Sequence, residues 1–242
     1  MSTQPSASAT QHDSRQLASH WHTAALVGVI LAVAVTGTLL QRSGSLRALD
    51  SADRLPENGR IVGQYLPMLL VNWGLTLYVA RLFRARNALP VLLGRGWRSL
   101  GQAGADLSYA LGACVLVALL ELLSARYLGV GRNVAVYALL PRSEAERLTW
   151  VLVALSVGFC EEVVYRGYLQ TQLAAFTGRS STGIVLQAIL FGAAHADQGA
   201  AAALRIAAYG LVLGILVQAR RSLWPAITCH IAIDVASGLL HR

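Results

Sequence analysis

The chain is divided into long apolar blocks, and the first of them is long enough to cross a bilayer. Residues 23–40 contain no charged side chain, and a helix of about 20 apolar residues spans the hydrocarbon core of a membrane. Charged residues make up only 13% of the chain, against about a quarter in soluble domains. These blocks therefore predict a membrane protein, with lipid in place of water as the main solvent.

Further apolar blocks follow, and the later ones are shorter and more polar. A helix satisfies its own backbone hydrogen bonds inside hydrocarbon, which irregular chain does not. The predicted fold is all-α: a polytopic transmembrane bundle of about seven helices, with the functional site among the last four. The predicted helices cover residues 23–40, 61–82, 107–123, 148–169, 183–194, 204–217 and 226–240.

Three regions are expected along the chain. Residues 1–20 are rich in Ser, Thr, Gln and Ala, a composition typical of disorder. They lack the layout of a cleaved signal peptide, so the first apolar block is expected to remain as an anchor. Residues 21–147 are predicted to be anchor helices, and residues 148–242 a catalytic core.

The charge pattern fits a membrane protein better than a nucleic-acid-binding protein. All 20 basic residues are arginine, against 12 acidic residues, but the arginines stand singly or in small groups between apolar blocks. Polytopic membrane proteins distribute basic residues in this way. Membrane lipid is the expected partner, and no nucleic acid is expected.

Three cysteines lie within apolar blocks, at positions 114, 160 and 229. Their wide spacing fits neither a disulfide framework nor a CxxC metal site. We interpret them as packing residues. Cys160 directly precedes Glu161, so a thioester role is the alternative for it, although buried structural thiols are usually inert.

Ionisable residues deep in an apolar helix usually mark function, because they are expensive in lipid. Apart from Glu121, all of them lie in the last four predicted helices. Glu161, Glu162 and Arg166 follow a continuously apolar stretch. Glu162 and Arg166 are i,i+4 neighbours that can pair, while Glu161 points about 100° away. A purely structural ion pair is the plainer interpretation.

Two histidine motifs follow on separate helices. His195 ends a short block, where an isolated histidine is more often an interfacial residue than a catalyst, and the small residue Gly192 before it would let another helix approach closely. His230 and Asp234 share one helix face, a spacing suited to a histidine oriented by a carboxylate. Alternatively, these two residues only satisfy each other inside the bundle.

Taken together, the three motifs resemble the CAAX-protease and bacteriocin-processing family of intramembrane proteases. The order is Glu-Glu-x-x-x-Arg, then Phe-x-x-x-His, then His-x-x-x-Asp, each on its own apolar segment between residues 148 and 240. The resemblance implies hydrolysis of a peptide bond in or near a membrane segment of a protein or peptide. It implies a CAAX-like tail, a bacteriocin precursor or a C-terminal sorting anchor as substrate, and a bacterial cytoplasmic membrane as location.

The family pattern also implies roles for single residues. Glu161 would be the general base that activates water, and His195 would share that water. His230 and Asp234 would polarise the scissile carbonyl group, with Asp234 where members carry Asn or Asp. Glu162 and Arg166 would form a support pair, and Arg166 is also a candidate to bind a substrate carboxylate.

A glutamate mechanism without metal is favoured, because the chain has no HExxH motif. If zinc were used instead, the resemblance implies Glu161, His195 and His230 as its ligands, and such N and O donors suit zinc. His230 follows His195 by only 35 positions, a shorter distance than in larger members of the family. A smaller or laterally more open cavity than a prenyl-binding tunnel is therefore expected.

Non-hydrolytic functions are the alternatives. A family member without catalysis could sequester a peptide as an immunity factor, and intramembrane Glu, His and Asp also build the proton relays of transporters. No inverted repeat or pair of interrupted helices is visible in the sequence, as a transporter would often show. The combination of all three motifs favours the protease.

Overall fold

The computed structural model describes residues 18–43, 58–85, 89–127, 136 and 139–240. Within these ranges the chain is almost entirely helical and contains no β-strand, which confirms the predicted all-α bundle. The predicted disordered segment lies outside the described residues as far as residue 17. In chain order the elements are α2 (His20–Arg42), η1 (Ile61–Tyr65), α4 (Leu66–Ala85), α5 (Leu89–Leu93), α6 (Leu100–Tyr127), α8 (Glu144–Glu161), η2 (Glu162–Gln170), α9 (Thr171–Thr177), α10 (Ser180–Ala194), η3 (Ala196–Gln198), α11 (Ala200–Arg220) and α12 (Trp224–Leu240).

Five of the described helical stretches are long and apolar enough to cross a membrane, and α10 and α12 are shorter apolar helices. They correspond to the seven predicted segments, and the chain is an integral membrane protein. The first three stretches are largely exposed at the surface of the bundle, with 22%, 17% and 22% of their apolar windows buried, against 56% in the fourth. The long stretches are His20–Arg42, Ile61–Arg84, Leu100–Tyr127, Glu144–Thr177 and Ala200–Arg220.

The longest stretch joins α8, η2 and α9 into one continuous helix. It begins at a capping box, in which the Ser143 hydroxyl accepts from the Glu146 backbone N–H and the Glu146 carboxylate accepts from the Ser143 backbone N–H. Such a box satisfies backbone donors that a helix start leaves unpaired. It ends at Gly178, whose positive φ of 71° turns the chain towards α10.

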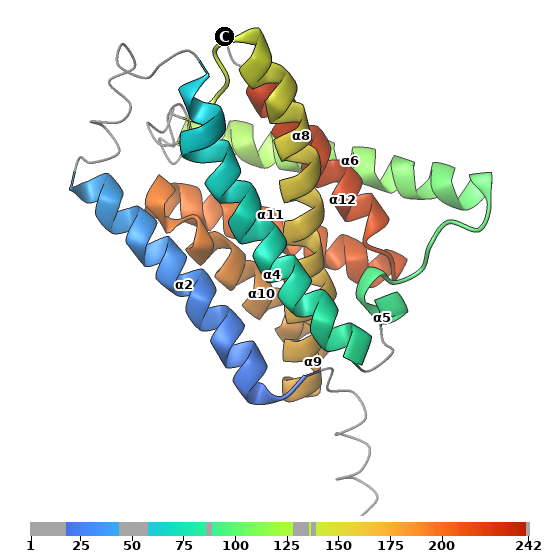
Figure 1. Cartoon of the computed structure of the whole chain (residues 1–242). Coiled ribbons are helices and arrows are strands. Elements are labelled where there is room, and N and C mark those ends of the chain that lie inside the picture. Colours follow the sequence, from blue (N-terminus) through green and yellow to red (C-terminus); the bar gives the residue numbers. More distant parts are fainter. Residues whose placement is uncertain (1–17, 44–57, 86–88, 128–135, 137–138, 241–242) are drawn as a thin grey trace, which may run out of the picture.

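The helices from α8 onwards pack against one another at the centre of the bundle. The earlier helices α2, α4 and α6 pack against the outside of this group. α10 packs along α11, while α12 lies between α8 and α6. Figure 1 shows α2 and α4 on the near side of the bundle and α6 crossing it at a steep angle to α8. Close approach of α10 to α11 depends on Gly192, because a Cβ there would lie 2.5 Å from the Ala203 carbonyl oxygen.

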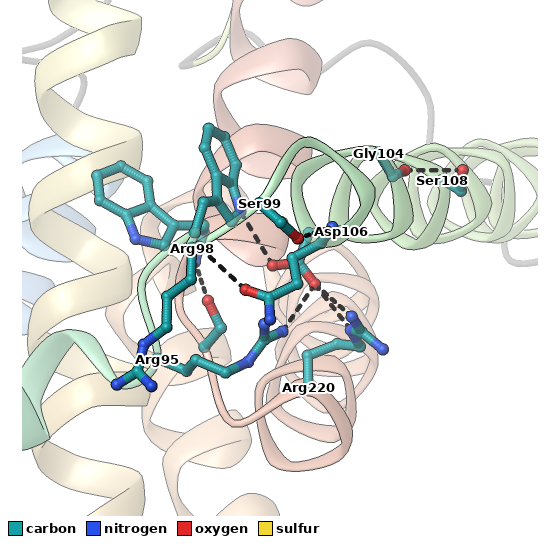
Figure 2. Close-up of polar contacts among 11 residues, drawn as sticks. Arg95, Arg98, Ser99, Gly104, Asp106, Ser108 and Arg220 are labelled. Atoms are coloured by element: carbon teal, nitrogen blue, oxygen red, sulfur yellow. Dashed lines mark hydrogen bonds and ion pairs between the residues drawn. The ribbon is translucent and has the colours of Figure 1, made fainter.

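One buried carboxylate joins the ends of several helices. Asp106, on α6, is fully buried and accepts hydrogen bonds from Arg95, Trp97 and Arg220. Figure 2 shows Arg95, from the segment before α6, and Arg220, from the end of α11, converging on Asp106. Just beyond this cluster, the Leu223 backbone N–H donates to the Leu93 carbonyl at 3.1 Å. These contacts hold the end of α11 and the start of α12 against the segment before α6.

Glu121 also has a structural partner on α11. Its carboxylate accepts from Arg205 at 2.8 Å and from the Tyr209 hydroxyl. The side chain of Glu121 remains 53% exposed. Glu121 therefore links α6 to α11, away from the motifs of the last helices.

Candidate active site

The Glu-Glu-x-x-x-Arg motif lies where α8 changes into the π-helical segment η2. π-helical turns are rare and are frequent at functional sites. Every residue of η2 is buried. The i,i+4 pair expected on this helix is present, with Arg166 Nη1 2.7 Å from Glu162 Oε1 and both side chains fully buried. A paired charge is the form in which lipid-buried Arg and Glu are tolerated.

Glu162 has a second partner on α12. The Nδ1 atom of His230 lies 2.7 Å from Glu162 Oε1, the same oxygen that Arg166 contacts. From the sequence, Arg166 was the only predicted partner of Glu162. No local pattern indicates its contact with His230, which is 68 positions away. Packing of α12 against α8 and η2 creates it. Glu162 therefore orients the imidazole ring of His230 as well as pairing with Arg166.

The other ring nitrogen of His230 faces two carboxylates. Its Nε2 atom lies 3.7 Å from Glu161 Oε2 and 3.6 Å from Asp234 Oδ2. These distances suit ion pairs but exceed ordinary hydrogen bonds. The side chains of Glu161 and Asp234 are 16% and 28% exposed, so both are accessible from outside the packed core. The first and third motifs thus meet at His230.

The second motif contributes a ring and a histidine. The Phe191 ring centroid lies 5.0 Å from that of His195 and 5.9 Å from that of His230. The guanidinium carbon of Arg166 lies over the same ring at 4.3 Å. Phe191 therefore separates the two histidines and packs against the buried ion pair.

The hydrogen bonds of His195 fix its tautomer. Nδ1 lies 2.8 Å from the Phe191 carbonyl oxygen. Because a carbonyl oxygen only accepts, Nδ1 is the donor, and the lone pair of the neutral ring is on Nε2. Among the described residues no ion pair joins His195 to Glu161, although His195 lies within electrostatic range of Asp234. The expected sharing of one water by Glu161 and His195 stays a prediction.

Asp197 lies beside His195 and was not singled out from the sequence. It belongs to the short turn η3 between α10 and α11 and packs against Gly37 of α2. Burial raises the pKa of the Asp197 carboxyl, while neighbouring His195 acts in the opposite direction. In the sequence, only its position two residues after His195 could have indicated a role for Asp197. An acidic residue at that spacing from a histidine is common by chance.

Cys160 and the possible zinc ligands complete the set of predicted residues. Cys160 is fully buried, and its carbonyl accepts from the Thr76 hydroxyl at 3.5 Å. The part of the chain that the structure describes contains no group of three His, Cys, Asp or Glu side chains arranged to hold a metal ion. The alternative of a zinc site at Glu161, His195 and His230 stays a prediction.

Comparison with protein-family models finds a match over the segment that contains these site residues. Residues 143–236 match the family model described as type II CAAX prenyl endopeptidase Rce1-like. The matched model describes the same family that the three motifs resemble. It begins at the N-cap of α8 and ends two residues beyond Asp234, so it includes every residue of the site. No curated protein and no solved structure matches the chain.

Proposed function

We propose that the chain is an intramembrane endopeptidase that hydrolyses a peptide bond in or beside a membrane segment of another protein. Its substrates would be CAAX-like tails, bacteriocin precursors or C-terminal sorting anchors, in the cytoplasmic membrane of a bacterium. The observation that carries the proposal is the meeting of Glu161, Glu162 and Asp234 at His230, inside the segment that matches the CAAX family.

Glu161 would act as the general base. In this step, its carboxylate removes a proton from water, and the oxygen of that water attacks the carbonyl carbon of the scissile bond. The proton then passes to the leaving amine. A positioned acid–base group of this kind contributes about 100-fold or more to a rate. The partial exposure of Glu161, 16% of its side chain, supports this role because a base must be reached by water.

His230 would stabilise the negative charge on the carbonyl oxygen. The Glu162 carboxylate accepts from Nδ1–H of His230, which leaves Nε2 directed towards Glu161 and the reacting group. His230 would donate to the carbonyl oxygen through Nε2–H in its doubly protonated form. Donors fixed in place before the reaction stabilise developing charge without reorganising. His195, with its Nδ1 engaged by Phe191, would share the attacking water through Nε2. Asp234 would supply polar support to His230.

The proposed mechanism uses no metal, and this has its own test. Dialysis of the purified protein against a strong chelator is expected to leave turnover unchanged. A loss of turnover that added zinc restores would instead assign Glu161, His195 and His230 as ligands that assemble on metal binding. Glu161→Gln then serves as the control, because it removes activity with or without chelator.

The decisive experiment compares cells that carry the wild-type chain with cells that carry Glu161→Gln at equal expression. Mass spectrometry of the termini of membrane proteins should reveal a few proteins that keep an anchor or pro-segment only in the variant. Glu144→Gln is a matched control, because Glu144 lies on the same helix with a side chain that is 83% exposed. That variant should process the same proteins as the wild type.

Unchanged termini in the Glu161→Gln cells would reject proteolysis by Glu161. If a peptide or protein still co-purified with that variant, a sequestering function would replace the protease. Purified protein and a substrate identified in this way should then show turnover reduced by about 100-fold or more in Glu161→Gln.

A further inference from the structure

Two free cysteines that are far apart in the sequence lie side by side in the bundle. Cys114 is on α6 and Cys229 is on α12, and their Sγ atoms are 3.1 Å apart. Their separation of 115 residues gave no indication of this contact. The interpretation of both as packing residues was therefore incomplete, because the structure places them as a dithiol pair.

The surroundings of the pair allow the two helices to approach closely. Cys229 is fully buried, whereas Cys114 is partly exposed. Small side chains flank both thiols, with Ala110 and Ala113 on α6 and Ala226 on α12 in one apolar cluster. The sulfur atoms of a disulfide are about 2.05 Å apart. Closing the bond therefore requires a movement of about 1 Å.

The pair lies next to the proposed catalytic histidine. Cys229 directly precedes His230, whose ring reaches Glu162 at 2.7 Å. The following residue, Ile231, packs tightly against Gly158 of α8, where an added Cβ would lie 2.8 Å from Ile231 Cγ1. This turn of α12 is held between α8 and α6, so a pull towards α6 changes the position of His230 relative to Glu162.

We propose that Cys114 and Cys229 are a redox modification site, whose disulfide ties α6 to α12 and stops turnover by displacing His230. This effect on turnover rests on the proposed proteolytic function, whereas formation of the bond does not. The oxidant class is a hydroperoxide, which reaches Cys114 first because that thiol is the exposed member of the pair.

The chemistry is balanced in two steps. The Cys114 thiol attacks the hydroperoxide, which leaves as an alcohol, or as water from hydrogen peroxide, and Cys114 becomes a sulfenic acid. The Cys229 thiol then attacks the sulfenic sulfur, forms the S–S bond and releases water. A small dithiol such as dithiothreitol reverses the reaction by thiol–disulfide exchange.

The test treats the full-length protein in lipid nanodiscs with cumene hydroperoxide, an apolar hydroperoxide, and maps cysteine linkages by mass spectrometry. We expect a Cys114–Cys229 link with Cys160 still reduced. Turnover of the wild-type protein should fall in proportion to the link and return with dithiothreitol, since a misplacement of about 1 Å can cost about 100-fold in rate. Cys114→Ala and Cys114→Ser should keep their turnover under the same oxidant.

Each outcome decides a separate point. Absence of the link, with Cys114 oxidised further or unreacted, overturns the modification site. A link that leaves turnover unchanged overturns its control of catalysis. The same mapping on Glu161→Gln separates the two proposals: the link should form there too, so failure of the proteolytic function does not remove this readout.

Discussion

Asp106 and Glu162 are fully buried carboxylates that both pair with arginine, and they differ in how many of their oxygens are hydrogen-bonded. Both oxygens of Asp106 have donors: Trp97 binds one, and Arg95 and Arg220 bind the other. Glu162 uses one oxygen for both Arg166 and His230, while its Oε2 has no hydrogen-bond partner in the described part of the chain. Both carboxylate oxygens of Asp106 are therefore hydrogen-bonded, whereas only one oxygen of Glu162 is.

The difference supports a structural role for the Asp106 cluster and the proposed functional role for the Glu162 cluster. Buried polar groups are nearly always hydrogen-bonded, so each exception requires an explanation. The arginines around Asp106 are 29% and 21% exposed, so their charges reach solvent or headgroups. Glu162 and Arg166 are both fully buried, and Glu162 also contacts His230. We infer that Asp106 holds helix ends together, whereas Glu162 holds His230, the side chain proposed to take part in catalysis.

Glu162→Gln should give the largest effect. The amide leaves the Arg166 charge buried without a counter-charge and weakens the hold on His230. We expect turnover to fall by about 100-fold or more and unfolding free energy to fall by about 3 kcal/mol. Turnover of a substrate peptide and thermal unfolding in detergent measure the two effects.

A double variant separates those effects. Glu162→Gln with Arg166→Met removes both charges, so most of the lost stability should return, because a buried ion pair is often replaceable by apolar packing. Turnover should stay low, since His230 is still released. Recovery of turnover together with stability would show that Glu162 is structural, like Asp106.

Asp106→Asn should give the opposite pattern. It weakens the three contacts that join α6 to the segment before it and to the end of α11, so unfolding free energy should fall by about 2 kcal/mol. Turnover per folded molecule should stay near the wild-type value, because Arg95 and Arg220 can extend towards solvent. A large loss of turnover at temperatures where the variant is fully folded would place Asp106 in the functional network.

The packing of α12 against α8 near Asp234 can be tested in the same way. A Cβ at Gly238 would lie 2.0 Å from Trp150 Nε1, which donates to the Asp234 carbonyl at 2.8 Å. Gly238→Ala should cost about 2 kcal/mol of unfolding free energy by overpacking and lower turnover. Gly112→Ala on α6, where nothing lies within 4 Å, is the matched control and should be neutral or stabilising.

Asp234→Asn should give the smallest effect. Its carboxylate lies 3.6 Å from His230 Nε2, beyond a normal hydrogen bond, and Asn preserves its shape and polarity. Turnover within about threefold of wild type is expected, well under the roughly 1.4 kcal/mol that a tenfold change represents. A loss as large as that of Glu162→Gln would mean that the charge of Asp234 is required.

Local patterns by themselves determined the fold class and the identity of the motifs. Long apolar blocks can only be satisfied as helices in lipid, and the fixed geometry of a helix sets Glu162 beside Arg166 and His230 beside Asp234. The order of three motifs on separate blocks was sufficient to indicate the family. These are properties of residues that are near in sequence, which is why they could be predicted.

The tertiary structure decided which residues meet across helices. Contacts between Glu162 and His230, between Cys114 and Cys229, and between Asp106 and Arg220 join positions 68, 115 and 114 residues apart. Nothing in the local sequence encodes such pairs, because they depend on helix rotation and register. Small residues such as Gly158 and Gly238 influence that register, because they allow a neighbouring helix to approach closely. Only the packing of the whole bundle shows which helix lies against each glycine.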